Sequence, residues 1–195
     1  MLISNFKSTY KKYIVKIPKN VLVIYSDLNG YLLFKKENKV VFTKTRFRLY
    51  FLNKTFFQIS PEVIGNNNRL LSQKEIKKYL NTQVSLIKKH LADVSVTPHK
   101  KLIFVGLGYK FFLIKNHLRL LQLKLGYSHD VYVKVPSNID LKWHNQNSIY
   151  VSGSSTATVS HFVNKIKEYK IPDPYLGKGI LFANEKILLK KGKQA

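Results

Sequence analysis

Six histidines and ten carboxylates are the side chains of this 195-residue chain that could perform acid–base chemistry or hold a metal ion. No histidine has a second histidine or a carboxylate at the spacing of metal ligands on a helix, and the HExxH pattern is absent. The chain has no cysteine, so it has neither disulfides nor thiolate metal sites. We therefore expect no metal site, and we interpret the histidines as polar residues that lie on the surface or face RNA.

Two short motifs resemble catalytic ones without meeting their requirements. Ser128, His129 and Asp130 have the residue types of a hydrolase triad, but adjacent side chains point apart, whereas a triad is assembled from distant segments. Gly106 and Gly108 begin a dinucleotide-binding pattern, but the third glycine is missing and strand-like sequence follows. The sequence thus predicts that the protein is not an enzyme, with no catalytic residue and no cofactor.

A segment near the C-terminus is better suited to binding phosphate. Pro172 and Pro174 favour an extended backbone, and Gly177 and Gly179 flank Lys178. Glycines allow backbone N–H groups to approach a surface closely, while the lysine presents a compact cation. The charge continues to the end of the chain in Lys186, Lys190, Lys191 and Lys193. This segment favours contact with RNA over a solvated tail.

The overall charge points the same way. Lysine and arginine total 34 against 10 aspartates and glutamates, which gives a net charge of +24. A folded chain with this excess repels itself unless a polyanion neutralises it, and nucleic acid is the commonest such partner. An anionic membrane surface is the alternative. It is disfavoured because the basic residues lie between strand-like segments and not on one amphipathic helix.

The choice of basic residues also reflects the base composition of the genome. Arginine occurs only at positions 46, 48, 69 and 119, and all other basic residues are lysines. Asparagine, isoleucine, phenylalanine and tyrosine are plentiful, and all of these residues have AT-rich codons. The 12 phenylalanines and 12 tyrosines are therefore interpreted mostly as core residues and not as a surface for stacking bases.

The first half of the chain is predicted to be a set of short strands followed by one helix. Residues 13–59 alternate strand-like runs with turns, of which 29–30 and 37–38 are the clearest. Residues 72–75 fit a capping box, which predicts a helix to position 91. Its expected apolar face consists of Ile76, Leu80, Val84, Ile87 and Leu91.

The second half repeats this order. Strand-like runs between residues 101 and 136, with a turn at 115–117, are followed by shorter ones at 140–143 and 148–151. A second helix begins after 153–155 and is ended by the prolines. Its expected apolar face consists of Ala157, Val159, Phe162, Val163, Ile166 and Tyr169.

This order predicts an α+β fold of two tandem similar domains. Each would be a small, mostly antiparallel sheet packed on one helix, and a basic C-terminal tail would follow. The expected boundaries are a basic N-terminal tail at 1–12, domains at 13–97 and 98–182, and the C-terminal tail at 183–195.

Several motifs of the second half together resemble one known family. They are Gly106–Lys110, Leu125–His129, Pro172–Ile180, Glu185 and Lys191–Lys193. In order and interval they are similar to the bacterial-type L-six family of large-subunit ribosomal proteins, over roughly residues 100–195. The segment with proline, tyrosine and the Gly-Lys-Gly triplet is that family's signature.

The resemblance is weaker in the first half and has departures in the second. Ile14–Pro18 resembles the family's opening strand, and the helix of residues 72–91 lies where that of the first domain is expected. Lys35–Asn38 replaces the family's glycine-proline-lysine-glycine turn. Leu176 stands at a usual lysine and Asp130 at a usual proline, which leaves RNA contacts at those two positions in doubt.

The resemblance implies two duplicated domains that bind large-subunit rRNA near the stalk base and the sarcin–ricin region. Neighbouring ribosomal proteins would be partners and translation factors would dock nearby, with no membrane partner and no homo-oligomer. A non-ribosomal organellar RNA-binding protein is the alternative. From the resemblance and the basic tail, the expected RNA-binding residues are Lys110, Ser128, His129, Tyr175, Gly177, Lys178, Gly179, Lys190, Lys191 and Lys193.

The compartment follows from two further expectations. Family members begin a few residues before their first strand, as this chain does, so no cleaved presequence is expected. With the AT-rich codon signature, this favours synthesis inside an organelle and a ribosome of the mitochondrial matrix. A plastid or the bacterial cytoplasm is the alternative.

Overall fold

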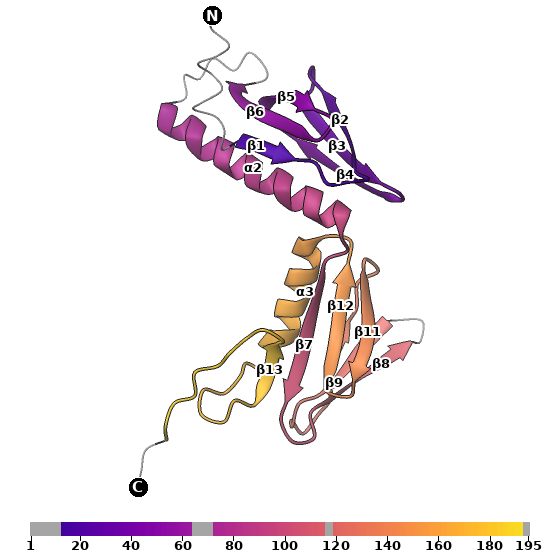
Figure 1. The fold of residues 1–195 in the computed structure, drawn as a ribbon. Helices are drawn as coiled ribbons and strands as arrows, with labels where there is room; N and C mark the ends of the chain where they lie inside the picture. Colours follow the sequence, from indigo (N-terminus) through magenta and orange to yellow (C-terminus); the bar gives the residue numbers. More distant parts are fainter. Residues whose placement is uncertain (1–12, 64–71, 116–118, 193–195) are drawn as a thin grey trace, which may run out of the picture. The chain divides into compact units, whose positions relative to one another are not determined.

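The computed structural model describes residues 13–63, 72–115 and 119–192 (Figure 1). The chain divides into two compact units, residues 1–96 and 97–195. In the described residues each unit has one helix and two small antiparallel sheets. The predicted α+β class is confirmed, although each unit divides its strands between two sheets and not one. The expected N-terminal tail and the centre of the 115–117 turn lie outside the described residues.

In its described residues the first unit has six strands. One sheet has the order β1-β6-β5 and the other β2-β3-β4. Both predicted turns are present: β2 and β3 are joined through Gly30 at φ +66°, and β3 and β4 through Glu37 at φ +50°. The strands are β1 (Ile14–Lys16), β2 (Leu22–Ser26), β3 (Tyr31–Lys36), β4 (Lys39–Lys44), β5 (Phe47–Asn53) and β6 (Phe56–Val63).

Helix α2 (Gln73–Ser95) begins at the predicted capping box. The Ser72 backbone N–H donates to Glu75 Oε2 at 2.9 Å, and the Ser72 hydroxyl oxygen accepts from the Glu75 N–H. The helix continues one turn beyond the expected end, and the Lys36 ammonium donates to the Ser95 carbonyl at 2.7 Å. Four of the five predicted apolar residues are buried in the core, and Ile76 packs partly buried against it.

The second unit contains a four-stranded sheet, β11-β12-β7-β13, and a three-stranded sheet, β10-β9-β8. Helix α3 (Thr156–Glu168) lies along one face of the four-stranded sheet (Figure 1). The strands are β7 (His99–Val105), β8 (Lys110–Lys115), β9 (Arg119–Lys124), β10 (Val131–Lys134), β11 (Ile139–Asn145), β12 (Ser148–Gly153) and β13 (Gly179–Phe182).

The predicted apolar face of α3 is correct except at its first residue. Val159, Phe162, Val163 and Ile166 are buried, and Tyr169 packs partly buried against the core. Ala157 is exposed, so its assignment to this face was wrong. It precedes Ile166 by nine residues, about two and a half helical turns, which places the two on opposite sides.

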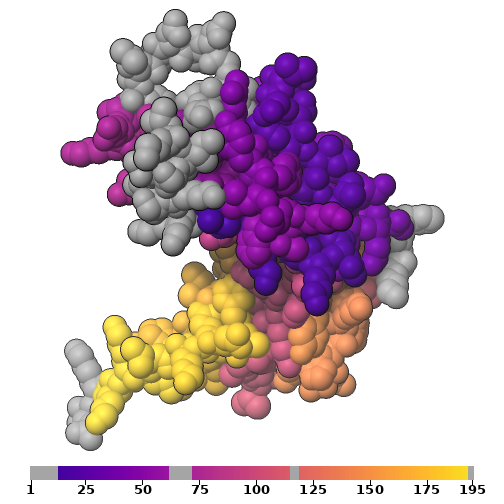
Figure 2. Space-filling model, turned by 45° about the horizontal axis from the view of Figure 1, so that its top comes forward, coloured from indigo at the N-terminus to yellow at the C-terminus, as the bar shows by residue number. Residues whose placement is uncertain are grey.

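Strand β13 was not predicted: its residues were placed at the end of the second domain, in the segment expected to contact RNA, and not in a strand. Gly179–Phe182 pairs antiparallel with β7, and Ile180 is fully buried. The residues after β13, up to 192, have no regular secondary structure and extend away from the sheet (Figures 1 and 2). In the described part of the chain, neither helix is long and apolar enough to span a membrane.

Candidate nucleic-acid interface

Three of the sequence motifs meet the end of α3 at one cleft of the second unit. The cleft is shallow, with a volume of about 450 Å³. It brings together the end of the β7–β8 turn, the β9–β10 turn, the C-terminal end of α3 and the loop before β13. We call it the tyrosine cleft. Its lining residues are Tyr109, Tyr127, Glu168, Tyr169, Lys170, Ile171, Asp173 and Lys178.

Tyr109 forms the floor of the tyrosine cleft, and two motif glycines make room for its ring. A Cβ atom on Gly106 would lie 2.9 Å from the Tyr109 ring, and one on Gly126 would lie 3.2 Å from it. Gly126 also has φ +74°, a conformation that disfavours other residues. The Gly-Leu-Gly-Tyr and Leu-Gly-Tyr motifs therefore pack on each other around the Tyr109 ring.

Tyr127 forms one wall of the cleft, and contacts to both its hydroxyl and its ring hold it in place. Its hydroxyl donates to the Tyr169 carbonyl at 2.9 Å, and the Lys170 ammonium lies 4.4 Å from its ring centroid. The His129 ring stacks on it at 6.0 Å with an interplanar angle of 16°. Ser128 and His129 are both exposed on this turn. The wall thus presents a fixed aromatic ring beside a cation, an arrangement suited to nucleic acid.

A closed loop presents the Gly-Lys-Gly segment on the other side. Asp173 organises it: its carboxylate accepts from the Tyr175 N–H at 3.0 Å and its carbonyl from the Gly177 N–H at 2.8 Å. The Asp173 N–H in turn donates to the Lys178 carbonyl at 3.0 Å. Gly177 has φ +69°, as the turn requires. Tyr175 and Lys178 are exposed as a result.

The remaining predicted site residues are more scattered. Lys110 is exposed at the start of β8 and does not line the tyrosine cleft. Gly179 is buried in β13, where a Cβ atom would lie 2.5 Å from Pro172 Cα. Lys190 and Lys191 are exposed, and the Lys190 N–H donates to the Pro174 carbonyl at 2.9 Å. Lys193 lies outside the described residues.

Two features of the site were not anticipated. Lys170 completes the wall beside Tyr127. Its position directly after α3 and before the two prolines is the sequence feature that could have identified it as a site residue. The second feature concerns the departure at Asp130. Its carboxylate accepts from Gln122 Nε2 at 2.6 Å and lies 4.0 Å from the Lys124 ammonium, so this residue ties the turn to β9. Among the described residues no three histidines or carboxylates form a potential metal site.

Glu185 fastens the segment after β13 to helix α3. Its carboxylate accepts from the Lys167 ammonium at 2.5 and 2.7 Å and from the Phe182 N–H at 3.1 Å. The hydrogen bond from Lys167 holds the pKa of Glu185 below its ordinary value of 4.5, and the Phe182 N–H lowers it further against the opposing effect of desolvation. The charged form of Glu185 is therefore favoured in the folded protein.

Replacing Glu185 with Gln is expected to flatten the acid limb of the stability curve, which is the fall in the free energy of unfolding as the pH is lowered. Because the folded-state pKa is lowered, the carboxylate stabilises the fold above its unfolded pKa, and this contribution is lost as the pH falls below about 4.5. At neutral pH the substitution should lower the free energy of unfolding by roughly 0.5 kcal/mol, as for a partly exposed ion pair. Urea unfolding over a pH series measures both effects.

The exposed Glu168, which no described ion pair involves, provides the matched control. Replacing it with Gln should leave the acid limb as in the wild type. Parallel acid limbs for the Glu185 variant and the wild type would contradict the role of the Lys167 pair.

Comparison with known proteins gives a consistent result. No family model matches the chain. It is similar to proteins named large ribosomal subunit protein uL6. The one from Mycoplasmoides gallisepticum is 38% identical over 141 residues, which cover 71% of this chain and 75% of the relative. The protein from Mycoplasma genitalium is 35% identical, with 68% of each chain covered. That from Chloroherpeton thalassium is 34% identical, with 71% of this chain and 79% of the relative covered.

Proposed function

This chain belongs to the family of the large ribosomal subunit protein uL6, and on that premise we propose that it binds large-subunit rRNA through the tyrosine cleft. Family membership makes the chain a structural constituent of the large ribosomal subunit and not an enzyme. It is expected to assemble with rRNA and with other ribosomal proteins. What remains to be assigned is the surface that contacts the RNA.

The observation that carries the proposal is the joint presence of cations and a fixed aromatic ring in one cleft. Lys170 and Lys178 both line it, and no ion pair in the described residues involves either. Two carboxylates also line it, those of Asp173 and Glu168. The Asp173 carboxylate accepts a hydrogen bond from the Tyr175 N–H, and Glu168 is exposed. Lysine ammonium groups bind RNA phosphates by releasing counterions, and Tyr127 offers an aromatic surface beside them.

The other predicted residues either present the side chains of the cleft, support its structure or lie outside it. Tyr175 and Gly177 belong to the loop that presents Lys178, and Ser128 and His129 to the turn that presents Tyr127. Gly179 is reassigned from direct contact to support, because it is buried against Pro172. Lys110 and the tail lysines, Lys190, Lys191 and Lys193, extend the basic surface outside the tyrosine cleft.

We also propose where in the ribosome the chain lies. Its site would be near the stalk base and the sarcin–ricin region of the large subunit, so that translation factors dock nearby. Two domains at 13–97 and 98–182, with basic tails at both ends, would each present a surface to the RNA. Any influence on a factor's GTP hydrolysis would be indirect.

The compartment is a separate part of the proposal. The AT-rich amino-acid usage favours a ribosome of the mitochondrial matrix. The relatives named above are bacterial, and they fit a bacterial cytoplasm instead. The mitochondrial and bacterial alternatives can be distinguished by identifying this chain in purified ribosomes. The ribosomes are taken from isolated mitochondria of the source, or from the whole cell if the source is bacterial.

Replacing Lys178 with Glu is expected to weaken binding to large-subunit rRNA by roughly 10- to 100-fold, since a charge-assisted hydrogen bond is worth roughly 1.5–3 kcal/mol. The variant should also show a smaller dependence of affinity on salt, because fewer counterions are released. Filter binding over a salt series measures both, and co-sedimentation with large subunits measures incorporation.

The matched control is Lys77→Glu, which reverses an exposed charge on α2 in the other unit. It should reduce affinity less and leave incorporation intact. If Lys178→Glu were incorporated as well as the wild type, the tyrosine cleft would not be the contact. If the wild-type chain itself failed to bind the rRNA, the entire proposal would be wrong.

A further inference from the structure

A second cluster of basic and aromatic residues lies on the four-stranded sheet, on the face opposite α3. In the strand register Lys142 of β11 is paired with Tyr150 of β12, which is paired with Lys101 of β7. Directly paired residues project from the same face of a sheet, so these three side chains form one row. The neighbours of Tyr150 along β12, Ile149 and Val151, are fully buried and define the opposite, core-facing side.

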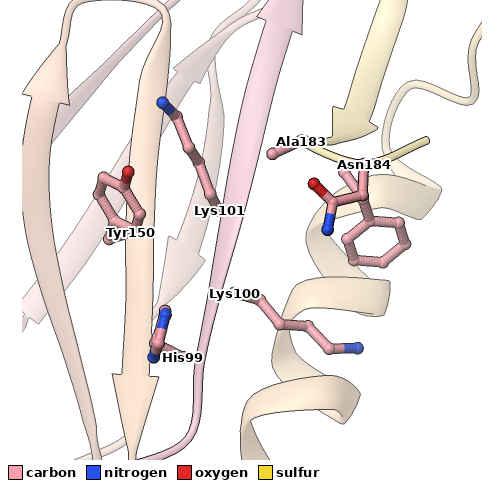
Figure 3. A pocket seen from close by; sticks show the side chains of 7 residues that line it. His99, Lys100, Lys101, Tyr150, Ala183 and Asn184 are labelled. Carbon is pink, nitrogen blue, oxygen red and sulfur yellow. The ribbon is translucent and has the colours of Figure 1, made fainter. Parts of the chain in front are cut away.

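This outer face is open and slightly hollow. At its edge a concavity of about 460 Å³ lies beyond the end of β13. Figure 3 shows the side chains of His99, Lys101 and Tyr150 on one side of β7 and that of Lys100 on the other. In the described part of this unit, the core residues of α3 and of the three-stranded sheet pack on the inner face. The concavity is lined by His99, Lys100, Lys101, Tyr150, Phe182, Ala183 and Asn184.

The cluster is rich in cations that no carboxylate neutralises. The Lys101 ammonium lies 5.2 Å from the Tyr150 ring centroid. Lys100 projects from the opposite side of β7, where its ammonium lies 5.0 Å from the Phe182 ring centroid. No ion pair within the described residues involves Lys100, Lys101 or Lys142. By contrast, Asp140 on the same face is paired with Arg119 at 3.4 Å. The face is therefore complementary to an anion that also carries an apolar ring.

We propose that this face binds an unpaired nucleotide of RNA, with the base on Tyr150 and the adjoining phosphates on Lys101 and Lys142. A base would displace the Lys101 ammonium from the ring, at a cost that a phosphate contact by the same flexible side chain offsets. Tyrosine accepts any base because every base has a π face, and RNA is read mainly where bases are unpaired. The His144 ring, edge-on to Tyr150 at 5.6 Å, limits movement of the tyrosine.

This site is distinct from the tyrosine cleft and rests on the proposed rRNA-binding function. Val105, at the other end of β7, is paired with Gly179 beside the Gly-Lys-Gly loop. Lys101 precedes Val105 by four residues, which is about 13 Å along a strand. The two sites thus lie towards opposite ends of β7, and one chain would hold two separate stretches of RNA backbone.

The test compares full-length variants in filter binding to large-subunit rRNA over a salt series. Tyr150→Leu is expected to weaken binding roughly tenfold without changing the salt dependence, because stacking releases no counterions. Tyr150→Phe should bind as the wild type does, since it retains the ring. Lys142→Gln should instead reduce the slope of log affinity against log salt by about one.

The control is Tyr79→Leu, which removes an exposed tyrosine with Arg46 at 5.9 Å from its ring in the first unit. It should bind as the wild type does. Circular dichroism verifies that each variant is folded, and a folded Tyr150→Phe with normal affinity shows that the face tolerates substitution. If Tyr150→Leu and Lys142→Gln both bound normally while Lys178→Glu did not, this inference would be wrong and the proposed function would stand. A wild-type chain that failed to bind rRNA would overturn both.

Discussion

Replacing Ile166 with Asp is expected to unfold the second unit. Ile166 is fully buried on the inner face of α3, among the apolar side chains of the core. Burial of an unpaired carboxylate should cost about 4–5 kcal/mol, a large part of the stability of an ordinary domain. Hydrogen exchange of the full-length chain is the measurement: amides of β7 and β12 should lose protection, while those of α2 should keep it.

Ala157→Asp is the matched control for this substitution. It places the same carboxylate on the same helix, at an exposed position in the first turn, where a negative charge is favourable. It should retain the protection of β7 and β12. Protection in Ile166→Asp equal to that of the wild type would show that the assigned face of α3 is wrong.

Replacing Gly179 with Ala should be the second most damaging change. The added Cβ would lie 2.5 Å from Pro172 Cα and 2.8 Å from Pro172 N, and both are backbone atoms that cannot rotate away. Gly179 also has φ +155°, outside the range that side chains prefer. We expect the free energy of unfolding of the second unit to fall by about 1–3 kcal/mol, as in other overpacked sites. Urea unfolding measures it.

Gly192→Ala is its control, because a Cβ atom there would meet nothing within 4 Å. The unfolding curve of this variant should match that of the wild type. Gly179→Ala should also weaken rRNA binding, since the displaced strand would carry Lys178 with it. Unchanged stability in Gly179→Ala would mean that the loop can move away from Pro172 at no cost.

Helix positions and turns could be predicted from the sequence because their signals are local. The capping box at Ser72, the apolar spacing along both helices and the turn at Glu37-Asn38 each depend on residues a few positions apart. All three were correct except at one position of the second helix, Ala157. The error at Ala157 arose because an alanine is apolar yet small, so its presence says little about which side of a helix faces the core.

Strand β13 and the tyrosine cleft could not be predicted in the same way, because both depend on partners far away in the chain. Gly179–Phe182 has four residues and is recognisable as a strand only through its pairing with β7, more than 70 residues earlier. Gly106 and Gly126 resembled turn glycines, and only the ring of Tyr109 between them reveals their packing role. The resemblance drew attention to these motifs without giving these reasons.

The position of β13 has a consequence for how the protein is made. Its partner β7 is the first strand of the second unit, whereas β13 ends at Phe182, close to the C-terminus. Domains fold as units during synthesis, the N-terminal one first. The first unit can thus reach its final structure on the translating ribosome before the sheet of the second is complete, because that sheet cannot close until residue 182 has been made. Until then, one edge of β7 would remain unpaired.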